Sequence, residues 1–139
     1  MTWQLYALLA AVAGGATAVL TKMGAAGVPP NTGVAIRTAV VFVFAVSLVV
    51  ASGEGRAWPR MSTRAVVFLV LSAIATGVSW LAYFRALQLG PVSGVAPIDK
   101  LSLVFAIGFA AVWLGEPVSG RTVTGVILIV AGALLTMRT

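Results

Sequence analysis

Residues 65–84 read AVVFLVLSAIATGVSWLAYF, a run of 20 residues without a charge. A helix of that length rises about 30 Å, which is the hydrocarbon thickness of a typical bilayer. Four more uncharged runs have a similar composition, at 1–21, 38–53, 101–115 and 122–137. One such run predicts a membrane-spanning helix, and the repetition predicts an all-α integral membrane protein.

The composition excludes most soluble proteins. Of the 139 residues, 60% are apolar and 9% are charged, whereas soluble domains are about 45–50% apolar and about 25% charged. The nine Lys and Arg stand singly, so they indicate lipid-headgroup anchors rather than a nucleic-acid surface. The chain has no Cys, no His and three acids, which leaves little for metal binding or acid–base catalysis. We therefore expect no enzyme activity, no metal, no cofactor and no nucleic-acid partner.

Two of the uncharged runs are shorter than a full span, so their helices must include charges. The second run must extend back over Arg37, and the fourth over Lys100 and Asp99. The first run is long for a signal peptide and lacks a cationic start, so we keep it as a span. Short turns rich in Gly and Pro leave no room for a soluble domain. The sequence predicts a single domain of five helices, near 3–22, 32–52, 64–86, 93–114 and 120–137.

The Lys and Arg counts on the two sides of the membrane are nearly equal. Four of them, at positions 56, 60, 64 and 121, share the side of the N-terminus. The other side has three, at positions 22, 85 and 138, or five if Arg37 and Lys100 are counted. Because this bias sets orientation, a near tie predicts insertion both ways, and two inverted copies would form an inverted-repeat pair. Alternatively, the cluster at 56, 60 and 64 fixes one orientation.

Small, hydroxylic and aromatic residues form one stripe on each of three predicted helices, at steps of three and four. Helix packing explains any single Ser or Thr, but three stripes together with a charge favour a lined central cavity. The predicted lining residues are Gly14 and Thr17 from the first helix, Arg37 from the second, Thr76, Ser79, Trp80 and Tyr83 from the third, and Asp99, Lys100, Ser102 and Phe109 from the fourth.

Asp99 is the strongest candidate, because a carboxylate at the bilayer centre costs about 2.5–3.5 kcal/mol. Lys100 points about 100° away around a regular helix, so the two side chains are expected not to pair. Asp99 would then be a proton acceptor or a counter-ion for a cationic group, and Lys100 would pair elsewhere or hold an anion. Alternatively, Pro97 opens the helix and Asp99 caps its free N–H groups. Between Pro91 and Pro97, residues 92–94 either unwind or stay helical beside a proline kink.

Three cations lie in or beside the predicted spans. Arg37, about a turn and a half into its helix, either extends to the headgroups or faces an anion or Asp99. Lys22 and Arg85 stand at helix ends, where we expect them to act as headgroup anchors.

The last predicted helix has a glycine face. Gly125 and Gly132 are seven residues apart and so lie on one side of the helix, with Ala131 next to Gly132. Small residues let another helix approach closely, and no polar group lines this side. We expect a dimer interface here, with packing inside the protomer as the alternative.

Several motifs occur in an order that resembles the EamA domain of the drug/metabolite transporter superfamily. They are Ala86-Leu-Gln-Leu-Gly-Pro91, Ala96-Pro97, Leu114-Gly-Glu-Pro117 and Gly125-x-Ile-Leu-Ile-x-x-Gly132. The resemblance covers essentially the whole chain and implies half of a ten-helix inverted-repeat transporter, completed by a second, inverted copy. The small multidrug branch of the superfamily uses a carboxylate in the first helix, where this chain has Gly14 and Gly15. Multidrug cation antiport is therefore not expected.

From this resemblance we expect a secondary transporter of small metabolites in a bacterial cytoplasmic (inner) membrane, working as an antiparallel homodimer by alternating access. Proton coupling would use Asp99, the one acid inside a predicted span. Two alternatives stay open. One is an obligate membrane subunit of a hetero-oligomeric transporter or non-catalytic assembly. The other is a channel, because pores and cavities use the same lining residues. The expected partners are a second copy, the bilayer and a small-molecule substrate.

Overall fold

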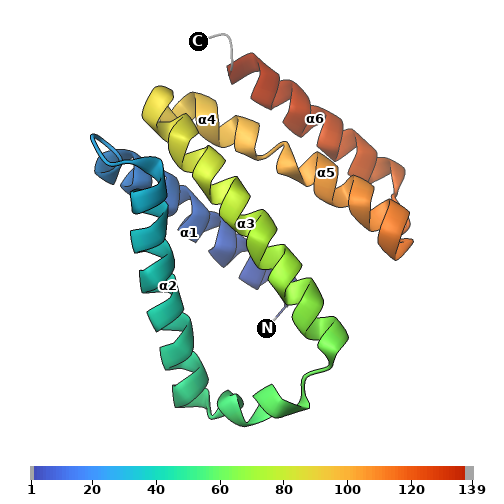
Figure 1. Cartoon of the computed structure of the whole chain (residues 1–139). Coiled ribbons are helices and arrows are strands. Elements are labelled where there is room, and N and C mark those ends of the chain that lie inside the picture. The colour runs from blue at the N-terminus through green and yellow to red at the C-terminus, as the bar shows by residue number, and fades with distance from the viewer. Residues whose placement is uncertain (1, 137–139) are drawn as a thin grey trace. The chain divides into compact units, whose positions relative to one another are not determined.

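A computed structural model describes residues 2–136, and within that range every regular element is helical (Figure 1). Four segments are long and apolar enough to cross a membrane, and α6 is apolar but shorter, so the predicted all-α membrane fold class is confirmed. The elements are α1 (Trp3–Gly24), α2 (Pro30–Ser52), the 3-10 helix η1 (Glu54–Arg60), α3 (Thr63–Leu89), α4 (Val92–Asp99), α5 (Ser102–Phe109), the π-helix η2 (Ala110–Leu114) and α6 (Gly120–Thr136). Residue 137 of the last predicted helix and Arg138 of the charge count lie outside the described residues.

The chain divides into two compact units, and each is described by itself. The first unit runs from Met23 to Arg85 and contains α2, η1 and most of α3. The second unit combines the N-terminal stretch through Lys22 with the stretch from Ala86 onward, and so contains most of α1 together with α4, α5, η2 and α6.

In the first unit, α2 and α3 converge where α2 begins and diverge toward η1 (Figure 1). Their close end holds a small core of Ala25, Val34 and Phe84. Gly33 makes the close approach possible, because a Cβ at that position would overlap the ring of Phe84. A glycine that admits a bulky neighbour against the helix backbone is a common device in membrane helices. The two helices are therefore held together at one end and leave a space between them farther along.

In the second unit, Lys22 near the end of α1 binds backbone carbonyl groups at the end of α3. Its ammonium donates hydrogen bonds to the carbonyl oxygens of Leu87, at 2.6 Å, and Gly90, at 2.8 Å. The last carbonyls of a helix have no partner within the helix, so a cation there satisfies them. The expected headgroup anchor at Lys22 is therefore wrong: the side chain is half-buried and bound to backbone oxygens.

The fourth predicted span, 93–114, corresponds to Val92–Leu114, but its helix is interrupted and divides into α4, α5 and η2 (Figure 1). Residues 92–94 are helical, and the break lies after Pro97, at Lys100 and Leu101. Pro97 has no N–H to give to the helix ladder. The backbone N–H groups of Lys100, Leu101, Leu103 and Val104 donate to carbonyl oxygens three residues back instead of four, as in Lys100 N–H to Pro97 O at 3.1 Å. The segment before the break, α4, packs against α6.

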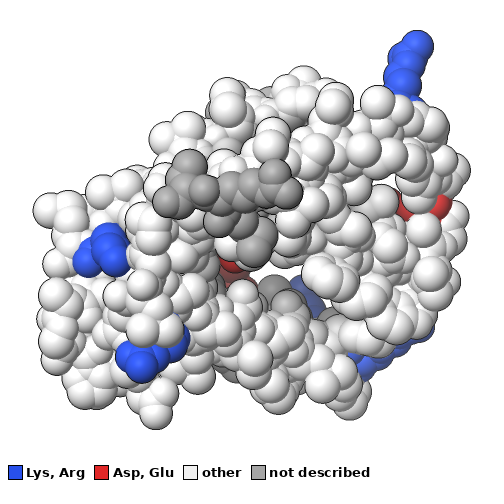
Figure 2. Space-filling view, turned by 90° about the horizontal axis from the view of Figure 1, so that it is seen from above, with Lys and Arg blue, Asp and Glu red and all other residues white. Residues whose placement is uncertain are grey.

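The apolar side chains of the described helices are mostly exposed. Phe42, Phe44 and Val78, for example, keep 67%, 64% and 65% of their surface accessible. Figure 2 shows charged atoms as isolated spots on an otherwise uncharged face. Continuous apolar surface of this kind is covered by lipid or by another protein in its native setting. The helices therefore have the length and the apolar surface of a multi-pass membrane protein.

Candidate functional site

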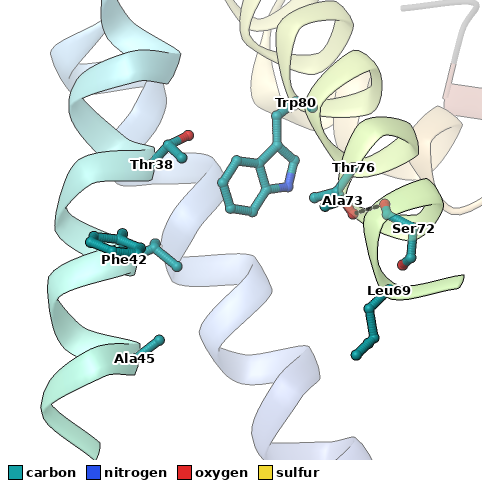
Figure 3. A pocket seen from close by; sticks show the side chains of 10 residues that line it. Thr38, Phe42, Ala45, Leu69, Ser72, Ala73, Thr76 and Trp80 are labelled. Carbon is teal, nitrogen blue, oxygen red and sulfur yellow. Dashed lines mark hydrogen bonds between the residues drawn. The ribbon is translucent and has the colours of Figure 1, made fainter. Parts of the chain in front are cut away.

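A groove of about 390 Å³ lies between α2 and α3 in the first unit (Figure 3). Thr38 and Phe42 of α2 face it from one side, and the indole of Trp80 on α3 enters it from the other. The full lining is Thr38, Val41, Phe42, Ala45, Leu69, Ser72, Ala73, Thr76, Gly77 and Trp80. Polar groups are costly on membrane helices unless they face a cavity or a neighbour, so this groove is the natural place for them.

The two threonines of the groove present acceptors rather than donors. The hydroxyl of Thr38 donates to the carbonyl oxygen of Val34, and that of Thr76 to the carbonyl oxygen of Ser72, each at 2.9 Å. The Thr76 bond is the dashed line in Figure 3. Each hydroxyl proton is thus used within its own helix, and the oxygen lone pairs remain for a ligand. The neutral donors of the lining are the Ser72 hydroxyl and the Trp80 indole N–H.

Arg37 directly precedes Thr38 in α2 and lies against Trp80, which is a residue of the groove lining. The carbon at the centre of its guanidinium lies 5.2 Å from the centroid of the Trp80 indole, a cation–π contact. Its Nη1 atom is buried and has no hydrogen-bond partner among the described residues, although the side chain as a whole stays partly exposed. Of the two alternatives raised by the sequence, extension to the headgroups is not what the structure shows, because the guanidinium is turned onto the α3 aromatic ring.

The other predicted residues of α3 do not line the groove. Ser79 is turned about 100° around the helix from Trp80 and is exposed. Tyr83 lies farther along α3, toward the buried Phe84. The predicted stripe therefore splits, with Thr76 and Trp80 in the groove lining and Ser79 and Tyr83 outside it.

Asp99 and Lys100 form an ion pair, so the expectation that they could not pair is wrong. Lys100 Nζ lies 3.3 Å from Asp99 Oδ2, and their side chains are 67% and 36% exposed, respectively. The expectation assumed a regular helix, but α4 ends at Asp99 and Lys100 lies in the turn that follows, with a ψ of −10°. The capping alternative also fails, because Asp99 is the last residue of α4 and Pro97 lies inside that helix.

A second hollow, of about 610 Å³, lies in the second unit. It is lined by Lys100, Ser102, Leu103, Ala106 and Ile129. Of the predicted residues, Lys100 and Ser102 line this hollow. Asp99 is not in the lining but is paired with Lys100. Phe109 instead stacks on Trp113, with ring centroids 4.8 Å apart, on the next turn of the same segment.

The predicted α1 residues line neither hollow. Thr17 donates its hydroxyl proton to the carbonyl oxygen of Ala13 at 2.9 Å. A Cβ added at Gly14 would meet nothing within 4 Å. The glycine face of α6 is similarly open, since a Cβ at Gly125 or Gly132 would also meet nothing within 4 Å, and Ala131 is exposed. The predicted dimer interface at these three residues stays a prediction.

Sequence reasoning missed the α2 side of the groove. Thr38 and Phe42 are four residues apart and therefore share a face. The signal was present in the sequence, because a threonine directly after Arg37 adds a second polar group to the same predicted span. What the sequence did not give is the partner of that face, which depends on how Phe84 packs on Gly33.

Comparison with known proteins supports a transporter fold over the whole chain. Residues 1–138 match the EamA-like transporter family. A protein of Sinorhizobium sp., named as an uncharacterized transporter in the cobO 3' region, is 43% identical over 134 residues. The aligned stretch covers 96% of this chain and 95% of that protein. No solved structure is a significant match.

Proposed function

Because the chain belongs to the EamA-like transporter family, we propose that it is a secondary transporter of small metabolites in a bacterial cytoplasmic membrane. It works as an antiparallel pair of identical chains. The observation that carries the proposal is the groove between α2 and α3, where Thr38, Thr76 and Trp80 place polar groups on helices that are otherwise apolar, with Arg37 against the Trp80 ring. Polar groups on a membrane helix are costly unless they have a partner, and a solute bound in the groove would be that partner.

Three observations support a pair. Long apolar side chains on every spanning helix are exposed, so each chain offers large surfaces to a mate. The Lys and Arg counts on the two sides are four against three to five, which favours no orientation strongly. The Sinorhizobium relative is matched over 95% of its length, so it too has the length of one such domain. Two inverted copies would form the inverted repeat from which many secondary transporters are built.

In this proposal each groove becomes part of a central site, and rocking of one copy against the other opens that site to one side of the membrane at a time. Asp99 is the proposed site of proton coupling. It is paired with Lys100 at a helix end, and protonation of the carboxylate would release the ammonium.

The experiment is a measurement of orientation that uses the absence of cysteine from the sequence. An Ala57→Cys variant carries one thiol, in the exposed η1. We expect a membrane-impermeant maleimide to label about half of the molecules in intact cells and the rest only after the membrane is opened. Labelling entirely from one side would contradict the antiparallel pair.

Two charge variants sharpen this test. Replacing Arg56, Arg60 and Arg64 with Gln should favour one orientation, and the pair Gly55→Lys and Met61→Lys should favour the other. Each variant alone is expected to lack solute uptake, whereas their co-expression restores it. The same preparations are screened for thermal stabilisation by amino acids, amines and carboxylates. No stabilisation by any of them would contradict a small-metabolite site.

A further inference from the structure

We infer that the groove between α2 and α3 is a binding site for a small monocarboxylate with an apolar body, and that Arg37 is the residue that receives its carboxylate. This inference rests on the proposed transport function and names the class of solute for the same site. It is carried by the position of the Arg37 guanidinium, stacked on Trp80 with a buried, unpartnered nitrogen.

The first step is the charge of Arg37. Its contact with Trp80 supports a cation but supplies no acceptor for its N–H groups. The buried Nη1 lacks a hydrogen bond among the described residues, and leaving a charged donor unpaired is costly. A guanidinium in this state is prepared for an oxygen acceptor, and a carboxylate matches its planar fork with two parallel bonds.

The second step is the absence of an acid that could take this role within the same unit. Residues 23–85 contain five Arg and one acid, Glu54. Glu54 lies in η1, beyond the far end of α2, and 17 helical residues from Arg37 correspond to about 25 Å. Among the described residues no ion pair joins Arg37 to a carboxylate, and Asp99, which belongs to the other unit, is paired with Lys100. We therefore assign the missing anion to a ligand.

The third step is the number of charges. One cation in an apolar surround is balanced by one negative charge, whereas a dicarboxylate would leave a surplus. A zwitterion or an amine would bring an ammonium, for which the lining offers no anionic group. The lining does offer neutral acceptors at Thr38 and Thr76, so a neutral N–H or O–H on the ligand is accommodated.

The fourth step is the shape of the rest of the ligand. Most of the groove beyond Arg37 is hydrocarbon, with Val41, Phe42 and Leu69 on its walls. Figure 3 shows the Trp80 indole directed from α3 toward α2, and Phe42 lines the same groove. An apolar or planar body would be buried against these groups, with its carboxylate at the Arg37 end.

The test uses three probes that share one phenylethyl skeleton and differ in charge: 3-phenylpropanoate, phenylalanine and 2-phenylethylamine. Their binding to the purified full-length protein in lipid nanodiscs is measured by calorimetry, with empty nanodiscs as the blank. We expect saturable binding of 3-phenylpropanoate at least tenfold tighter than that of the other two. Equal binding of all three probes, or binding of none, would overturn the inference.

Variants then assign the contact. Arg37→Gln should weaken 3-phenylpropanoate at least tenfold and leave the amine unchanged, and Arg37→Lys should have an intermediate effect because it keeps the charge but not the fork. The matched control is Arg64→Gln, which removes an arginine 5.8 Å from the ring of Phe68, outside the groove. If Arg37→Gln fails to fold, Arg37→Lys is the deciding variant. Unchanged affinity of Arg37→Lys for 3-phenylpropanoate, together with equal binding of the three probes, would contradict carboxylate binding by Arg37.

Failure of this inference is distinguishable from failure of the proposed function. If another solute class stabilises the protein independently of Arg37 while the orientation labelling is mixed, the carboxylate assignment fails and transport by an antiparallel pair stands. If the labelling is entirely from one side, the pair fails whatever the probes show.

Discussion

The ammonium of Lys22 lies 2.6 Å from the carbonyl oxygen of Leu87, and Leu87 is fully buried. One cation therefore joins the last turn of α1 to the last turn of α3, within the second unit. The bond to Gly90 extends this contact into the turn that leads to α4. A charge that would be costly in the membrane thus satisfies carbonyls that the helix end leaves free.

Replacement of Lys22 by Met should destabilise the protein. The variant keeps most of the side-chain length but loses two bonds from a charged donor, each worth about 1.5–3 kcal/mol at most. We expect the thermal unfolding midpoint in detergent to fall by several degrees. The control is Arg121→Met, which removes an exposed cation at the start of α6. An equal fall in both variants would show that loss of positive charge alone is responsible.

Gly33→Ala should also destabilise the protein, since its Cβ would overlap the Phe84 ring. Overpacking of this kind costs about 1–3 kcal/mol. Combining Gly33→Ala with Phe84→Leu should cost less than the sum of the single changes, because the smaller side chain makes room. Gly108→Ala in α5 is the control, because a Cβ there meets nothing within 4 Å. Strict additivity in the double variant would mean that the two residues do not determine each other's packing.

Asp99→Asn should remove the dependence of solute uptake on an imposed proton gradient, while solute exchange without a gradient continues. The amide keeps the size of the side chain but cannot take up a proton, and it no longer forms the ion pair with Lys100. Uptake into proteoliposomes with and without a pH difference measures this. Lys100→Met, which breaks the same ion pair and keeps the carboxylate, should retain gradient dependence. An unchanged rate and pH profile in Asp99→Asn would remove the proton role.

Leucine at Gly125 or Gly132 should weaken self-association without unfolding the chain. Neither position has an atom within 4 Å of an added Cβ, so the new side chain begins in open space. We therefore expect its bulk to displace a close neighbour from another copy. Cross-linking and light scattering in detergent would report the dimer fraction. Ile127→Phe, on the opposite side of α6, is the matched control, and an equal loss of dimer there would argue against a glycine interface.

The sequence predicted the helices well where a rule about composition was sufficient. The predicted helices 3–22, 32–52 and 64–86 correspond to α1, α2 and α3 within a few residues at each end. It failed where the outcome depended on local backbone geometry. Pro97 was recognised as a disturbance, but the break lies at Lys100, where the backbone bonds shorten to three residues. The ion pair of Lys100 with Asp99, which was not expected from a regular helix, lies at this break.

The candidate site was predicted in part. The part that was missed depends on tertiary contacts between helices. Thr76 and Trp80 share a face by spacing alone, which any helical sequence reveals. The opposite wall could not be found in this way, because it depends on the contact between Gly33 and Phe84 that brings α2 and α3 together. Lys22 was assigned to the lipid surface for the same reason, since a free carbonyl at the end of α3 is visible only in the fold.

The π-turn at Ala110–Leu114, where the N–H of Gly115 reaches back to the carbonyl oxygen of Ala110, holds one residue more than an α-turn would. Loss of one residue there would restore an ordinary α-helical turn. The side chains before and after the turn would then keep their directions around the helix axis. A deletion in the middle of α3 would instead rotate everything beyond it by about 100°. Homologues that differ by a single residue in length are therefore expected to have their gap in this turn rather than in the uninterrupted helices.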